Sequence, residues 1–197
     1  MSFQLGLTGS IGMGKSTTAA MFAEQGIPVW DADRAVHRLY APLGAAVAPV
    51  ASLCPDAEVN GSIDRAALKS WIMSDASALK QIESVVHPLV AADRTRFLRQ
   101  TATDLVVLDI PLLFENTTQT DFDATLLVTA TPAVQRSRVL ARSGMTLDQF
   151  NLLLSRQVPD SQKRGLATHI VETLTMDQTR AYVVALIANI RQGITDA

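Results

Sequence analysis

The residues with the clearest chemical meaning lie at positions 9–16, which read GSIGMGKS. This stretch fills every fixed position of the phosphate-binding loop pattern G-x-x-x-x-G-K-[ST]. Its glycines allow the backbone to curl with positive φ, so that successive N–H groups point at phosphate oxygens. Lys15 can then reach the β- and γ-phosphates, and the Ser16 hydroxyl can bind Mg²⁺. The stretch predicts a nucleoside triphosphate site.

The elements expected around this loop are those that the pattern requires. Residues 3–8 predict a strand that leads into the loop, and residues 17–25 predict the helix that leaves it. The alternative, a glycine-rich turn that binds nothing, is less favoured because of this context. The pattern alone does not choose among kinases, GTPases and ATPases. We expect triphosphate contacts from Gly9, Ile11, Gly12, Met13, Gly14, Lys15, Ser16 and Thr17.

Two further carboxylates, Asp31 and Asp33, follow the second predicted strand, at the sheet edge where open α/β sheets bind ligands. Alternation along an extended segment would put both carboxylates on one side. Asp33 is the preferred candidate for accepting the proton of an attacking hydroxyl or for helping to hold Mg²⁺. Asp31 is expected to have an orienting role beside it. The alternative is that one of the pair caps the following helix.

Other candidate residues lie after the third and fourth predicted strands. Residues 105–109 resemble a Walker B segment, an apolar strand that ends in an aspartate, although strands often end in this way. Residues 111–115 (PLLFE) are interpreted either as a wall of the substrate site or as a buried loop. Asp33, Asp109 and Glu115 all remain candidates for contact with Mg²⁺.

Arginines are expected on the helix after the fourth strand. Arg138 and Arg142 are four residues apart, which places them on one face of a helix that also carries Arg136. Guanidinium groups suit the charge that spreads over a phosphoryl group during transfer. A solvent-exposed basic face explains the same spacing equally well.

The pattern of apolar segments predicts a three-layer α/β fold with a parallel five-stranded sheet, because continuous apolar runs suit strands buried on both faces. The interval at about 36–101 shows only helix and turn patterns, and His87-Pro88 within it predicts a helix start. We interpret the interval as an insertion that closes over a second substrate, or as one that serves only stability. The predicted strands are 3–8, 27–30, 104–110, 124–129 and 169–173.

Composition argues against several classes of protein. The chain has 197 residues and a net charge of −2 with scattered basic residues, which disfavours a nucleic-acid partner. Cys54 is the only cysteine, so no intramolecular disulfide can form. No apolar run approaches the roughly twenty residues of a membrane span. We expect a cytoplasmic protein that is a monomer or weak homo-oligomer, without a histidine metal site.

In this order, the motifs resemble those of the dephospho-coenzyme A kinase family. They comprise residues 7–16, 31–33, 61–65, 87–88, 111–115 and the arginine-bearing helix, and the resemblance covers nearly the whole chain. It implies a single P-loop kinase domain over 1–197, with a helical insertion at about 36–101 and a lid at about 136–165. The implied reaction transfers the γ-phosphoryl group of ATP to the ribose 3′-hydroxyl of dephospho-coenzyme A, the last step of coenzyme A biosynthesis.

The resemblance also implies residue roles. Asp33 becomes the general base, Lys15 the phosphate clamp, and Ser16, with Asp33, the contact for Mg²⁺. Arg138 and Arg142 become catalytic lid residues. The implied acceptor contacts are Thr8, Asp33, Arg65, His87, Leu112 and Glu115.

Two positions depart from the family pattern. Ser10 stands where glycine is common, and serine suits this position only if its φ is negative or if the strain of a positive φ is offset. Residues 168–175 lack the Asn and Gly of the family's D-x-x-I-x-N-x-G segment. If that segment frames the adenine, recognition of the base differs here.

Overall fold

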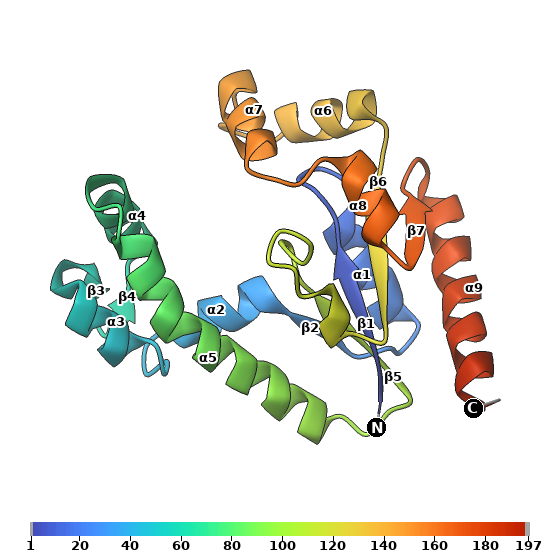
Figure 1. Ribbon diagram of the computed structural model, residues 1–197, viewed down its shortest axis with the longest axis horizontal. Coiled ribbons are helices and arrows are strands. Elements are labelled where there is room, and N and C mark those ends of the chain that lie inside the picture. Colours follow the sequence, from blue (N-terminus) through green and yellow to red (C-terminus); the bar gives the residue numbers. More distant parts are fainter. Residues whose placement is uncertain (1, 196–197) are drawn as a thin grey trace. The chain divides into compact units, whose positions relative to one another are not determined.

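The computed structural model describes residues 2–195, which form two compact units. The first unit contains the described residues up to Trp30 and those from Ala102 onward, and the second spans Asp31–Thr101. The insertion expected at about 36–101 falls inside the second unit. Figure 1 shows the elements of both units in chain order.

The first unit is built on a five-stranded sheet with the strand order β2-β5-β1-β6-β7. Strand β1 pairs in parallel with β5 and with β6, and β6 pairs in parallel with β7. The predicted parallel α/β sheet is confirmed. Strand β2 starts two residues later than expected, at Val29, and Ile27 and Pro28 lie before it. The strands are β1 (Phe3–Thr8), β2 (Val29–Asp31), β5 (Leu105–Asp109), β6 (Ala124–Thr129) and β7 (His169–Glu172).

Local capping signals set the helix ends of the first unit. Thr146 and Gln149 form both hydrogen bonds of a capping box at the start of α7. Thr131 accepts from the N–H of Val134, and Pro132 follows it as the first residue of α6. Gly26, with φ of 75°, comes directly after the C-cap of α1, as a C′ glycine does. The helices are α1 (Lys15–Glu24), η2 (Gln119–Asp121), α6 (Pro132–Leu140), α7 (Leu147–Ser155), α8 (Asp160–Leu166) and α9 (Met176–Thr195).

Helices α1 and α9 cover one face of the sheet, where Phe22 and Leu186 belong to one core with Leu5 and Leu7. The opposite face is packed closely by the segment after β5. A Cβ added at Gly6 would lie 2.8 Å from Leu113 Cδ1, so a larger residue at that point of β1 would require the Leu113 side chain to shift. Buried strand residues on both faces explain the continuous apolar runs in the sequence.

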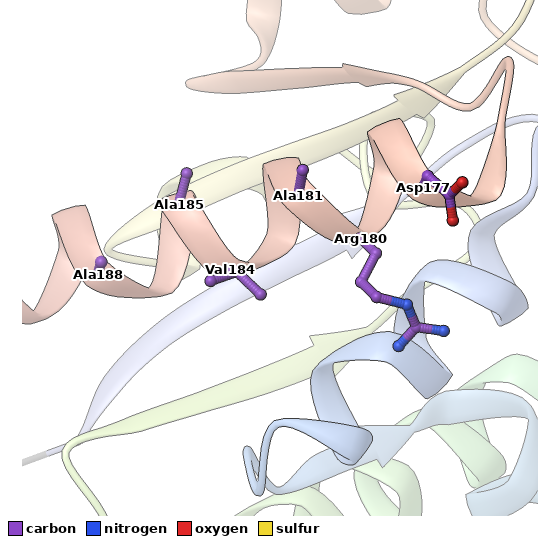
Figure 2. A pocket seen from close by; sticks show the side chains of 6 residues that line it. All are labelled: Asp177, Arg180, Ala181, Val184, Ala185 and Ala188. Atoms are coloured by element: carbon purple, nitrogen blue, oxygen red, sulfur yellow. The ribbon is translucent and has the colours of Figure 1, made fainter.

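The outer face of α9 bears a shallow hollow of about 530 Å³. Figure 2 shows short side chains along this face, and Arg180 extending toward α1, where it forms an ion pair with Glu24. No residue predicted for the functional site lines this hollow. The hollow is lined by Asp177, Arg180, Ala181, Val184, Ala185 and Ala188.

The second unit has its own apolar core, in which Leu39 of α2, Val50 of α3 and Ile82 of α5 take part. It contains a two-stranded antiparallel hairpin in addition to helices, so the expectation of helices and turns alone is wrong. Asn60 and Gly61 both have positive φ, which a two-residue hairpin turn of type I′ requires. Its elements are α2 (Ala32–Tyr40), α3 (Val47–Leu53), η1 (Pro55–Ala57), β3 (Glu58–Val59), β4 (Ser62–Ile63), α4 (Arg65–Ser74) and α5 (Ala78–Gln100).

The expected helix start at His87-Pro88 is also wrong, because Pro88 lies inside α5. A proline within a helix removes one backbone hydrogen bond. The helix nevertheless continues, since Val86 before Pro88 and Leu89 after it both pack into the core of the second unit. Tertiary packing outweighs the local signal here.

Within residues 2–195, no helix combines the length and apolar character needed to cross a membrane. The thiol of Cys54 is free and half-buried beside the core of the second unit.

Candidate nucleotide-binding site

The loop at residues 9–16 connects β1 to α1, the strand-loop-helix order that the motif requires. Gly12 and Gly14 have φ angles of 78° and 95°. Only three non-glycine residues of the described chain, Leu43, Asn60 and Thr117, have positive φ. Ser10 is not among them, so of the two alternatives for this position the negative φ is the one observed.

A matched pair of glycine substitutions tests how tightly the loop is packed. A Cβ at Gly12 would lie 2.4 Å from Val139 Cγ2 and 3.1 Å from the Gln135 carbonyl oxygen, whereas one at Gly26 meets nothing within 4 Å. Both positions have positive φ, so each alanine costs about 1–2 kcal/mol in backbone conformation. We expect Gly12→Ala to lower both the melting temperature and the affinity for ATP.

Gly26→Ala is the control for this prediction. Its melting temperature should fall by about 2–4 °C for each kcal/mol lost, with ATP affinity unchanged. Thermal denaturation and equilibrium nucleotide titration measure the two effects. Equal ATP affinities for the two variants would contradict tight packing at Gly12.

Lys15, the first residue of α1, forms an ion pair with the carboxylate of Asp109. The sheet register explains the contact, since Leu7 of β1 lies opposite Asp109 at the end of β5. Their side chains are 17% and 4% exposed, respectively. The Walker B interpretation makes Asp109 a candidate for contact with Mg²⁺, and the structure places its carboxylate against Lys15 of the loop.

A pocket of about 290 Å³ borders the loop, and it brings Arg138 and Arg142 beside Gly12 and Gly14. Both arginines were expected on one helix, but α6 ends at Leu140 and Arg142 lies beyond it. The helix closes there because the Arg142 N–H donates to the Val139 carbonyl, a three-residue turn, and Gly144 follows with positive φ. The pocket is completed by Thr17, Thr18, Thr173, Leu174, Thr175, Met176 and Thr179.

Thr173 is a site residue that sequence reasoning did not single out. Its hydroxyl donates to the Met13 carbonyl oxygen at 2.7 Å and accepts from Arg138 Nη1 at 2.8 Å. It therefore joins the loop to α6. Its place directly after β7, at the same sheet edge as the loop, is the signal that could have identified it.

Three residues expected at the acceptor lie in the first unit. The Thr8 hydroxyl is fully buried and donates to the Pro111 carbonyl oxygen at 3.2 Å. Leu112 is exposed. Glu115 Oε1 accepts from the Val158 N–H at 3.0 Å and lies 2.6 Å from Lys163 Nζ.

The remaining predicted residues belong to the second unit. Asp31 is the N-cap of α2 and accepts from the Arg34 N–H at 2.9 Å, as the capping alternative allowed. The extended segment expected for residues 31–33 is wrong, because the helix begins at Ala32 and carries Asp33 in its first turn. Asp33, Arg65 and His87 are all exposed.

Two titratable groups outside the loop respond to burial. Burial raises the pKa of the Tyr40 phenol, and the positive charge of Arg65 partly opposes that rise. Burial lowers the pKa of His169 at the start of β7, which favours its neutral form.

The fold and the loop together define a P-loop protein of the kinase-like α/β class. A solved shikimate kinase from Bacteroides thetaiotaomicron has this fold, with a TM-score of 0.52 at 15% identity over 96% of this chain and 98% of that one. A dephospho-CoA kinase from Campylobacter jejuni is more similar in fold, with a TM-score of 0.72 at 21% identity over 98% and 99% of the two chains.

Sequence comparison defines the family. The family model described as dephospho-CoA kinase matches residues 3–177. A dephospho-CoA kinase from Cereibacter sphaeroides is 62% identical over 190 residues, which cover 96% of each chain. The chain belongs to the dephospho-CoA kinase family.

Proposed function

We propose that this chain transfers the γ-phosphoryl group of ATP to the ribose 3′-hydroxyl of dephospho-coenzyme A. The observation that carries the proposal is the phosphate-binding loop, with Lys15 at the start of α1 and the arginine-lined pocket beside it. The 62% identity to a dephospho-CoA kinase supports the choice of acceptor.

The donor half of the site is assigned to the first unit. Backbone N–H groups of the loop and the N-terminus of α1 bind the phosphates, because unpaired N–H groups and the helix dipole favour an anion there. Lys15 exchanges its ion pair with Asp109 for the β- and γ-phosphates. Arg138 and Arg142, in the lid proposed at about 136–165, stabilise the charge on the transferring group.

The residues at the end of the loop suit a Mg²⁺ ion that arrives with ATP. Such an ion keeps several waters and takes only one or two protein ligands besides the phosphates. No group of three His, Cys, Asp or Glu side chains arranged for a metal occurs in residues 2–195, consistent with this mode. The exposed Ser16 hydroxyl is the proposed protein ligand, and Asp33 and Asp109 are further candidates. When bound, Mg²⁺ neutralises charge on the phosphates.

The acceptor half of the proposed site rests on the motif residues of the sequence. Asp33 accepts the proton of the ribose 3′-hydroxyl while the oxygen of that hydroxyl bonds to the γ-phosphorus of ATP. The bond between the γ-phosphorus and the β–γ bridging oxygen breaks, which yields ADP and coenzyme A. The exposed carboxylate of Asp33 in the first turn of α2 is open to a substrate. Thr8, Arg65, His87, Leu112 and Glu115 are the proposed acceptor contacts. Of these, Arg65, His87 and Leu112 are exposed, whereas Thr8 is buried and Glu115 pairs with Lys163.

The proposed function is tested by incubating the purified protein with ATP and Mg²⁺ and following ADP. Parallel reactions contain dephospho-coenzyme A, adenosine or no acceptor. We expect ADP only with dephospho-coenzyme A, in equal amount to coenzyme A. Stimulation by adenosine alone would indicate a nucleoside kinase, and hydrolysis without an acceptor would indicate a nucleotide-dependent switch.

A further inference from the structure

Lys163 of α8 is completely buried, which is rare for lysine unless its charge is paired. Its Nζ lies 2.6 Å from Glu115 Oε1 and 3.1 Å from the Ser10 hydroxyl oxygen. The Glu115 carboxylate balances the buried positive charge of Lys163, and the Ser10 hydroxyl accepts a hydrogen bond from the Lys163 ammonium. Ser10 is the second residue of the phosphate-binding loop, so this lysine joins α8 to the loop.

The next residue of the loop is held in the same way. The Ile11 N–H donates to Gln157 Oε1 at 3.2 Å, and the Ile11 carbonyl oxygen accepts from Gln135 Nε2 at 2.8 Å. Gln157 lies just before α8, and its neighbour Val158 donates its N–H to Glu115. The first half of the loop is therefore fixed by side chains from the segment 135–163.

We propose that Lys163 is a positioning residue for the phosphate-binding loop. Its ammonium, balanced by Glu115, holds the Ser10 hydroxyl and so keeps the first half of the loop in the conformation that binds the triphosphate. Because Lys163 is fully buried, it acts through Ser10 and does not contact the nucleotide. The inference deepens the proposed function, on which it rests.

The physical reason is preorganisation of the loop. A binding site whose donors are already in place spends less of the interaction free energy on ordering them when the ligand arrives. Without the contact to Lys163, ATP itself would have to order residues 9–11. Loss of this hydrogen bond to a charged group should therefore weaken ATP binding about tenfold.

Ser10→Ala isolates the contact. The substitution removes the acceptor hydroxyl and leaves the Lys163–Glu115 ion pair in place, and alanine suits a position without positive φ. Lys163→Met keeps a long side chain but removes the donor. The full-length wild type, both single variants and the double variant are titrated with Mg²⁺–ATP by calorimetry, and their melting temperatures are recorded.

Positioning through Ser10 predicts a non-additive result. Each single variant should raise the Kd for ATP about tenfold, and the double variant should bind no more weakly than Lys163→Met alone. Arg191→Met is the matched control, because it removes one exposed ion pair with Asp104, a residue that precedes β5 at the opposite edge of the sheet. Its Kd should equal that of the wild type.

Two results would overturn the inference. One is an unchanged Kd in Ser10→Ala, which decides the matter even if Lys163→Met does not fold. The other is a double variant whose loss equals the sum of the single losses, since a lysine that only stabilises the fold would not depend on Ser10. Failure of the proposed function is recognised separately, as a wild type that binds ATP without phosphorylating dephospho-coenzyme A.

Discussion

Replacing Asp33 with asparagine should lower kcat for phosphorylation of dephospho-coenzyme A by about 10²–10⁴, the usual contribution of a general base. Asparagine keeps the size of the side chain but cannot take the proton of the attacking hydroxyl. ATP binding should change little, because the phosphates are assigned to the loop of the first unit. Initial rates of ADP formation and calorimetric titration with ATP measure the two effects.

Asp75→Asn is a suitable control for this variant. Asp75 is a partly exposed carboxylate of the second unit, at the end of α4, and it accepts hydrogen bonds from the N–H and hydroxyl of Ser77, both at 2.7 Å. Asp75→Asn removes the same charge as Asp33→Asn, and the amide oxygen can still accept the hydrogen bonds from Ser77. Turnover near that of the wild type is expected for Asp75→Asn; the same result for Asp33→Asn would rule out Asp33 as the base.

Replacing Lys15 with methionine should abolish measurable phosphoryl transfer and also destabilise the protein. The lysine is assigned to the β- and γ-phosphates, so its loss removes stabilisation of the transferring group. In the structure it also pairs with Asp109, whose side chain is only 4% exposed. Removing one partner of a buried ion pair costs about 3–5 kcal/mol because it leaves a buried charge behind. Urea denaturation measures the loss of stability.

The double variant Lys15→Met/Asp109→Asn separates the two effects. Neutralising Asp109 removes the buried charge, so most of the lost unfolding free energy should return. Phosphoryl transfer should not return, because the phosphates still lack their lysine. A single Lys15→Met variant as stable as the wild type would show that the ion pair does not stabilise the fold.

Several helix ends in the structure follow from local signals in the sequence. The capping box at Thr146, the proline after Thr131 and the glycine at position 26 each act within one turn of chain, so they can be recognised without knowing the fold. Strand β6 agrees with its prediction at both ends, since a strand buried on both faces reads as one apolar run. Pro88 was misleading for the opposite reason, as distant apolar contacts hold α5 together around it.

By itself, the sequence determined the phosphate-binding loop, the order along the chain of the five strands of the main sheet, and the family, because these depend on residue types at fixed spacing. Only the tertiary structure decided which side chains support the loop. Lys15 meets Asp109 across 94 residues of sequence, Ser10 meets Lys163 across 153, and Met13 meets Thr173 across 160. Such pairs carry no local signal, since the order of strands in the sheet and the packing of helices on it bring them together.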